Sequence, residues 1–228
     1  MLVKNWMSKD VITVDVDDSM QNAIYILQEH NINILPVMEN GNIAGIITDR
    51  DLKKASPSDA TTLDMHELLY LISKIKVRNL MKKTVYTIPP DFTIEEAAAM
   101  LMEKRISGLP VVDEKKQLIG IITRSDIFRV IISLTGLGKK GLQFAVRIKD
   151  KPGPIKEIRE LISEYGARTA SILSSGDNAP PGYLNIYFRV YQIDRGKLPS
   201  LIKEIEKKGA MLYVVDHKED MRTIFNNQ

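Results

Sequence analysis

Apolar residues recur at the three- and four-residue spacing of a helix face in two separate stretches of the chain. Ser19 precedes the first stretch and Thr93 precedes the second. A side-chain oxygen at that position accepts a hydrogen bond from a free backbone N–H of the first helical turn. Each pattern therefore predicts a helix that begins just after its cap. The apolar positions are Ala23, Ile26 and Leu27 in the first helix and Ala97, Met100 and Leu101 in the second.

Short runs rich in β-branched and apolar residues flank both helices and predict strands. Another helix begins near Asp51 in the first stretch and near Asp126 in the second. Both stretches therefore read as β-α-β-β-α. The predicted strands are residues 11–14, 35–38 and 43–48 in the first stretch and residues 85–88, 109–112 and 118–123 in the second.

These two stretches are copies of each other, residues 3–52 and residues 77–127. Two copies are too few for a solenoid, which needs at least three repeats to bury its faces. We expect them to close on each other as one pseudo-symmetric unit, with ligand clefts at their interface. The apolar pairs Trp6-Met7 and Leu80-Met81 should pack one copy on the other. Identical residues in register are Val3/Val77, Asn5/Asn79, Met7/Met81, Thr13/Thr87, Asp17/Asp91, Pro36/Pro110 and Gly45/Gly120.

Two predicted linkers divide the chain, and the sequence pattern changes after the second one. Residues 56–59 break the chain after the first copy, and Asp64 can cap a helix through Ile75. The glycine-rich residues 135–141 form a second linker. Beyond it the order is β-α-β-β-α-β, which predicts a ferredoxin-like domain. Its predicted strands are residues 142–149, 168–174, 183–190 and 211–216, its helices are residues 152–165 and 198–208, and the tail from His217 should be irregular.

The predicted fold class is therefore α/β (α+β) with three domains, residues 1–75, 76–134 and 142–217. A chain of 228 residues is long enough for such cores. It has no cysteine for a disulfide or a thiolate site. No apolar run suits a membrane span or a signal peptide, so we expect a cytoplasmic protein without membrane contact.

Candidate chemistry is sparse outside the repeats. His30, His66 and His217 are scattered, and none lies at metal-ligand spacing. No Walker or G-x-S-x-G motif occurs, so we expect neither a metal nor an enzyme. Residues 133–228 hold 16 basic and 11 acidic residues, which leaves a nucleic-acid-binding regulator as an alternative. The acids are interleaved with the bases, as in Lys156-Glu157, and this favours a solvated surface over nucleic-acid contact.

The sharpest motif is G-x-x-T-x-x-D, which occurs once in each copy, at residues 45–51 and 120–126. Each lies where a strand leads into a helix. The threonine hydroxyl and the free N–H groups of that helix suit a phosphate. The aspartate suits a sugar diol, the role that an acid plays in dinucleotide folds. Alternatively, Thr48 and Asp51 are only helix caps. Two copies in register favour the binding site.

With their I-x-x-L-P-V segments (residues 32–37 and 106–111), these boxes resemble a tandem pair of CBS domains, a Bateman module. The D-x-P-G segment at residues 150–153 resembles the opening of an ACT domain, a regulatory amino-acid-binding fold. The order CBS–CBS–ACT is similar to that of AcuB-like acetoin-utilisation proteins.

The resemblance implies a regulatory sensor with no required cofactor that binds AMP, ADP, ATP or S-adenosylmethionine. It also implies a homodimer formed through the CBS pair and an unidentified protein target. An assembly module with empty sites is an alternative. The implied nucleotide-binding residues are Thr48, Asp51, Thr123 and Asp126 with Arg50, Arg124 and Ser125, and Thr13, Thr87, Ile34, Leu35, Pro36, Gly108, Leu109 and Pro110 around the adenine. The implied ACT effector-binding residues are Asp150, Lys151, Pro152 and Gly153.

The two boxes differ between their threonine and aspartate. The first has Asp49-Arg50 and the second has Arg124-Ser125. A carboxylate near a phosphate is unfavourable by roughly 1 kcal/mol at 4 Å in water. We therefore expect the second copy's site to favour polyphosphate ligands, and the first to hold a monophosphate, an uncharged ligand or nothing.

Overall fold

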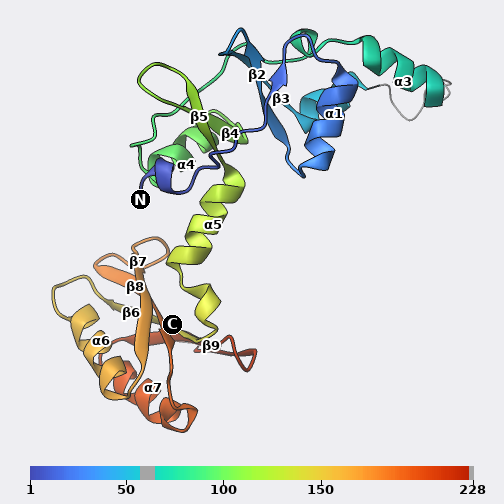
Figure 1. Ribbon diagram of the computed structural model, residues 1–228. Helices are drawn as coiled ribbons and strands as arrows, with labels where there is room; N and C mark the ends of the chain where they lie inside the picture. Colours follow the sequence, from blue (N-terminus) through green and yellow to red (C-terminus); the bar gives the residue numbers. More distant parts are fainter. Residues whose placement is uncertain (57–64, 226–228) are drawn as a thin grey trace. The chain divides into compact units, whose positions relative to one another are not determined.

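The computed structural model describes residues 1–56 and 65–225. They form two compact units, Met1–Phe128 and Arg129–Gln228 (Figure 1). Within the described residues, helices that could cross a membrane are absent, because none is both long and apolar enough.

The N-terminal unit contains the two copies, and the first has the predicted order β-α-β-β-α. The second lacks a regular first strand, because only a single bridge joins Ile88 to Val111. Asp64, the predicted cap of α3, lies outside the described residues. The elements are η1 (Val3–Asn5), β1 (Val14–Asp15), α1 (Met20–Glu29), β2 (Ile34–Glu39), β3 (Asn42–Thr48), α2 (Asp49–Ala55), α3 (Met65–Lys74), η2 (Val77–Asn79), α4 (Ile94–Glu103), β4 (Gly108–Val112), β5 (Leu118–Thr123) and α5 (Arg124–Leu134), which continues into the second unit.

Each copy packs a small sheet against its helices. Strand β2 pairs with β1 in parallel and with β3 antiparallel, and β4 pairs with β5 antiparallel. The strand residues Leu35 and Ile47 are fully buried, as is Ala23 of α1. The predicted apolar helix face therefore lies in the core.

The short segments that precede the copies are exchanged between them. The N–H of Val3 donates to the carbonyl of Phe92 at 2.8 Å, in the second copy. The N–H of Val77 donates to the carbonyl of Asp18 at 2.9 Å, in the first copy. Both valines are fully buried. Each lead-in segment is thus anchored in the other copy.

The glycines of the two boxes make room for this exchange. A Cβ atom on Gly45 would lie 2.5 Å from the Sδ of Met81. A Cβ atom on Gly120 would collide in the same way with the Sδ of Met7. The structure therefore confirms that Met7 and Met81 pack one copy on the other.

The C-terminal unit is an antiparallel sheet in the order β10-β9-β6-β8-β7. Its layout is compatible with the predicted βαββαβ domain. The core joins Phe144 and Phe188 of the sheet to Ile158 of α6 and Leu201 of α7. The elements are η3 (Leu137–Lys139), β6 (Leu142–Lys149), α6 (Pro154–Glu164), β7 (Arg168–Ser175), β8 (Tyr183–Tyr191), η4 (Arg195–Lys197), α7 (Leu198–Glu206), β9 (Ala210–Asp216) and β10 (Met221–Ile224).

Two predictions for this unit were wrong in detail. The first helix begins at Pro154 rather than at Pro152, because Gly153 has a φ of +114° and only the next proline takes the first helical position. The tail after His217 is not irregular, because residues 221–224 pair with β9. The Asp216 carboxylate accepts hydrogen bonds from the N–H groups of Lys218 and Glu219 and so reverses the chain.

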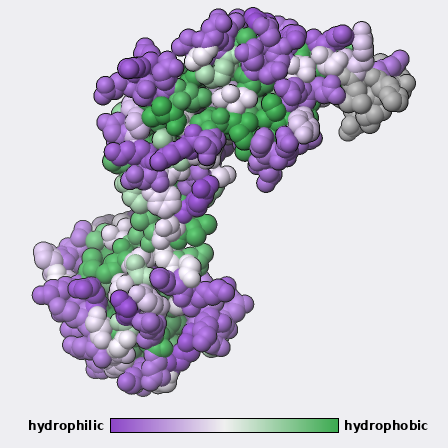
Figure 2. All heavy atoms as spheres, in the orientation of Figure 1, coloured by the Kyte–Doolittle hydropathy of each residue, from purple (hydrophilic) through white to green (hydrophobic). Residues whose placement is uncertain are grey.

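Large apolar side chains remain exposed on helices of the N-terminal unit. Tyr25 of α1, Met102 of α4 and Phe128 of α5 are 58%, 79% and 62% exposed. In Figure 2, apolar surface lies between bands of hydrophilic residues on this unit. These helices therefore offer apolar surface that a partner could cover.

Asp216 forms an ion pair in the C-terminal unit in which the carboxylate is largely buried. Arg195 Nε and Nη2 donate to the two carboxylate oxygens at 2.7 and 2.9 Å. The Asp216 side chain is 8% exposed. The hydrogen bond from Arg195 outweighs the effect of burial and lowers the pKa of Asp216 from 3.8 to about 2.

We predict that Asp216→Asn lowers the free energy of unfolding at pH 7 by about 2 kcal/mol, because each unit of pKa shift corresponds to about 1.4 kcal/mol. The folded-state pKa lies below the ordinary value, so this stabilisation is complete above about pH 4 and is lost as the pH falls through about 2. Calorimetric unfolding at several pH values measures it. The control Asp220→Asn changes an 85% exposed carboxylate and should have little effect. A pH-independent loss in Asp216→Asn would contradict the assignment.

Candidate functional site

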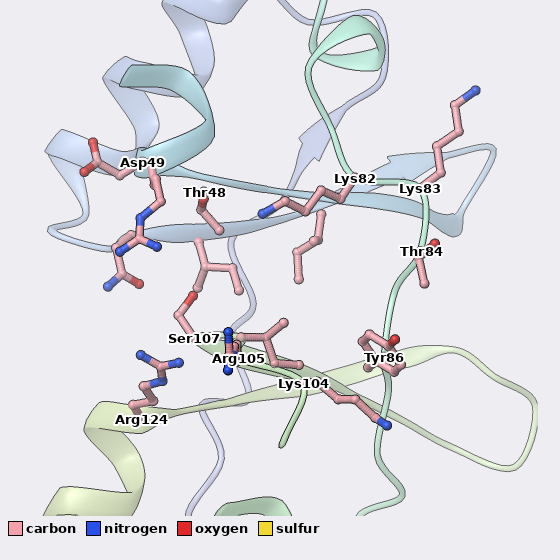
Figure 3. Close-up of a pocket in the computed structure, with 16 residues that line it drawn as sticks. Thr48, Asp49, Lys82, Lys83, Thr84, Tyr86, Lys104, Arg105, Ser107 and Arg124 are labelled. Carbon is pink, nitrogen blue, oxygen red and sulfur yellow. The ribbon is translucent and has the colours of Figure 1, made fainter. Parts of the chain in front are cut away.

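A pocket of about 850 Å³ lies between the two copies, within the N-terminal unit (Figure 3). This volume is typical of sites for small molecules and cofactors. Its walls come from both copies. The lining residues are Asn33, Ile34, Ile46, Thr48, Asp49, Arg50, Lys82, Lys83, Thr84, Tyr86, Lys104, Arg105, Ile106, Ser107, Gly108 and Arg124.

The exchanged lead-in segment places one wall of the pocket. Lys82 pairs with Ile46 of β3, since the N–H of Lys82 donates to the Ile46 carbonyl at 2.8 Å and the reverse bond is 3.0 Å long. This antiparallel pairing holds Lys82, Lys83, Thr84 and Tyr86 in the pocket wall beside β3, whose end leads through Thr48 into α2. The turn from α4 into β4 supplies the facing wall, residues 104–108.

Both boxes form helix caps. Thr48 Oγ1 accepts from the N–H of Asp51 at 3.3 Å, and Asp51 Oδ2 accepts from the Thr48 N–H at 3.1 Å. Thr123 and Asp126 repeat these contacts at 3.4 and 2.8 Å. Both boxes therefore cap their helices, as one of the two interpretations predicted. Their role in ligand binding stays a proposal.

Asp51 has a second partner from the other copy. Lys82 Nζ lies 2.9 Å from Asp51 Oδ1. Burial raises the pKa of Asp51, but hydrogen bonds from Thr48 and Lys82 and the charge of Lys82 outweigh it, so the pKa lies below 3.8. Asp51 is therefore ionised at neutral pH and offsets the charge of Lys82.

The pocket as a whole is cationic. Its described lining holds six cationic side chains and one carboxylate. That carboxylate, Asp49, pairs with Lys53 at 2.8 Å. In Figure 3, Lys82 and Arg124 point into the pocket, whereas Lys83 points away. The six cations are Arg50, Lys82, Lys83, Lys104, Arg105 and Arg124. Such a site suits an anionic ligand.

Only part of the predicted nucleotide site lines this pocket, and the role of all these residues stays a prediction. Leu35 and Leu109 are instead fully buried. The predicted residues in the lining are Ile34, Thr48, Arg50, Gly108 and Arg124. Those outside it are Asp51, Thr123, Asp126, Ser125, Thr13, Thr87, Leu35, Pro36, Leu109 and Pro110.

Lys82, Lys83, Lys104 and Arg105 line the pocket but were not predicted as site residues, because they reach the first box from the other copy. The sequence does contain a signal for these cations, because the two copies differ in charge at these positions. The corresponding residues of the first copy carry less positive charge, and they are Ser8, Lys9, His30 and Asn31.

The expected ligand preference of the two copies stays a prediction, but the charges around the first box do not favour it. Asp49 was expected to disfavour phosphates at the first box, but Lys53 offsets its charge. Arg124, expected to serve the second box, lines the same pocket as Thr48. The pocket at the first box is therefore strongly cationic.

The predicted ACT effector loop is exposed in the C-terminal unit. Asp150, Lys151, Pro152 and Gly153 all lie at the surface, and the Asp150 N–H donates to the Gly182 carbonyl at 2.9 Å. Effector binding there stays a prediction. Within the described residues, no group of three or more acidic or histidine side chains is arranged to hold a metal.

Comparison with known proteins identifies the two copies. The sequence profile of the CBS domain family matches residues 3–58 and 77–133. A CBS domain-containing protein of Dictyostelium discoideum is 38% identical over 135 residues, 59% of this chain and 93% of that protein. An uncharacterized protein of Methanocaldococcus jannaschii is 25% identical over 224 residues, 94% of this chain and 72% of that protein.

Among solved structures, a Vibrio cholerae protein named for acetoin utilization (AcuB) is 25% identical, with a TM-score of 0.51. It covers 62% of this chain and 97% of its own. With the family match to both copies, these similarities show that the chain belongs to the CBS domain family.

Proposed function

We propose that this protein is a regulatory sensor that binds an adenine-containing ligand, an adenosine nucleotide or S-adenosylmethionine, in the pocket at the Thr48 box. The observation that carries the proposal is the cationic pocket of about 850 Å³ between two CBS domains. CBS pairs bind adenosine ligands in such clefts, as the sequence resemblance implied.

The lining offers a partner for each part of a nucleotide. Ile34, Ile46 and Ile106 give apolar surface for a base, and Tyr86 adds an aromatic ring. The inward-pointing cations suit phosphate oxygens. Thr48 and the Asp51 beneath it suit the ribose hydroxyls, provided that Lys82 releases one carboxylate oxygen of Asp51.

Regulation follows if the ligand binds two arrangements of the CBS pair with different affinity. The exchanged lead-in segments provide a route, because ligand contacts with residues 82–86 act on a segment anchored in the other copy. We further propose that the C-terminal unit is an ACT domain that senses an amino acid at Asp150–Gly153 or serves dimerisation. The similarity to the AcuB protein supports acetoin utilisation as the context.

We predict that AMP, ADP, ATP or S-adenosylmethionine raises the melting temperature of the protein. A ligand at 100 times its Kd stabilises by about 2.7 kcal/mol, which corresponds to a shift of roughly 5–10 °C for a chain of this size. Thermal-shift titration measures it, with uridine phosphates as the control for non-specific phosphate binding. No shift with any of the four adenine ligands would refute the proposed function.

We also predict that the protein is a dimer formed through helices of the CBS pair. Light scattering after size exclusion should give twice the chain mass of 25.8 kDa. Met102→Lys and Phe128→Lys place charges on exposed apolar residues of α4 and α5 and should yield monomers. Met221→Lys alters a comparably exposed residue of the C-terminal unit and should leave the dimer intact. A wild-type monomer would contradict this arrangement.

A further inference from the structure

Arg105 has a backbone conformation that is unusual for arginine. It follows α4 with a φ of +53°, in the left-handed region. The N–H of Ile106 donates to the Leu101 carbonyl at 3.1 Å and the N–H of Arg105 to the Met102 carbonyl at 3.2 Å. These two bonds define a Schellman motif, whose left-handed position is usually glycine and sometimes asparagine.

The first copy has the same motif with a residue that suits it. Asn31 follows α1 with a φ of +50°. The Ile32 N–H donates to the Leu27 carbonyl at 2.9 Å, and the Asn31 N–H to the Gln28 carbonyl at 3.2 Å. Both copies thus have the same backbone conformation at this turn. The arginine occurs only in the second copy, and the turn does not require it. A strained residue at a pocket suggests a functional role.

Arg105 lines the pocket together with Arg124, and both are drawn at its lower side in Figure 3. Neither guanidinium has an acidic partner within 4.0 Å among the described residues, and the same holds for Arg50. Lys82 differs, because Asp51 already offsets its charge. Three guanidinium groups thus line the pocket without a carboxylate partner.

The equivalent positions of the other copy do not repeat this charge. Arg105 corresponds to Asn31, Arg50 to Ser125, and Lys82 to Ser8. Because the two copies are pseudo-symmetric, their equivalent positions can be compared directly. This comparison shows that the cations at the Thr48 box are specific to one side of the CBS pair.

We infer that this pocket selects a purine nucleoside that carries two or more phosphate groups, and that Arg105 is the residue that confers this selectivity. The inference rests on the proposed function. Three unpaired guanidinium groups carry more positive charge than a single phosphate, with a charge of at most −2, can neutralise. The phosphates of ATP carry enough negative charge, and their oxygens can accept bidentate hydrogen bonds from the guanidinium groups. S-adenosylmethionine carries a positive sulfonium, so the same groups disfavour it.

The test is calorimetric titration of the full chain with adenosine, AMP and ATP, using wild type, Arg105→Asn and the control Lys116→Asn. We expect wild type to bind ATP at least tenfold more tightly than AMP. Arg105→Asn should weaken ATP binding about tenfold or more, because a charge-assisted hydrogen bond is lost, and should change AMP binding less than threefold. Lys116→Asn removes an exposed cation from a left-handed position in the turn between β4 and β5, outside the pocket lining, and should change ATP binding less than threefold.

A second readout separates selectivity from folding. Arg105→Asn puts the residue of the first copy into a turn that suits it, so the melting temperature without ligand should stay the same or rise, by up to about 4 °C. Weaker ATP binding with a lowered melting temperature would overturn the inference, because the effect would then be structural.

The remaining outcomes distinguish this inference from the proposed function. Binding of adenosine or AMP as tight as that of ATP overturns the inference and leaves the proposed function intact. Binding of inorganic tripolyphosphate to wild type and its loss in Arg105→Asn support the polyphosphate site independently of adenine. Absence of binding by every adenine ligand overturns the proposed function, and with it the assignment of a nucleoside.

Discussion

The exchange of lead-in segments between the two copies is the contact on which the rest of the N-terminal unit depends. Val3 and Val77 are fully buried, and each is anchored by backbone hydrogen bonds to the opposite copy. Because the Lys82 backbone pairs with Ile46 of β3, the exchange also builds one wall of the pocket. The glycines of both boxes make the close approach possible, since a Cβ atom at either would meet a methionine from the other copy. The contacts that hold the two copies together therefore also form the site.

The boxes show how one motif can serve structure and binding together. Thr48 and Asp51 close a capping box, which orders the first turn of α2. The same contacts hold the threonine at the pocket and leave one carboxylate oxygen for Lys82. A cap is rigid, and rigid groups bind with less loss of entropy. Capping and ligand binding are thus compatible interpretations of the same residues.

The asymmetry between the copies lies in their surroundings more than in the boxes themselves. Both caps have the same geometry, with the aspartate Oδ2 accepting from the threonine N–H at 3.1 Å in one copy and 2.8 Å in the other. The difference comes from residues far from the boxes in sequence, above all Lys82 and Arg105. Duplication preserved the backbone, as the shared Schellman motifs of Asn31 and Arg105 show, and left side chains at the interface free to diverge in charge.

Local patterns determined most of the elements. Helix periodicity and caps placed α1 and α4, and alternation of turns and apolar runs gave the order of the C-terminal unit. Local signals failed where a distant contact decides: β10 forms because β9 offers an edge and Asp216 turns the chain, and α6 begins where Gly153 permits it. The repeat, the two boxes and the family resemblance can be read from the sequence alone, because each depends on residues a few positions apart. The cations that surround Thr48 depend on the tertiary structure, because the exchanged lead-in segment and the turn after α4 meet the box across the interface between the copies.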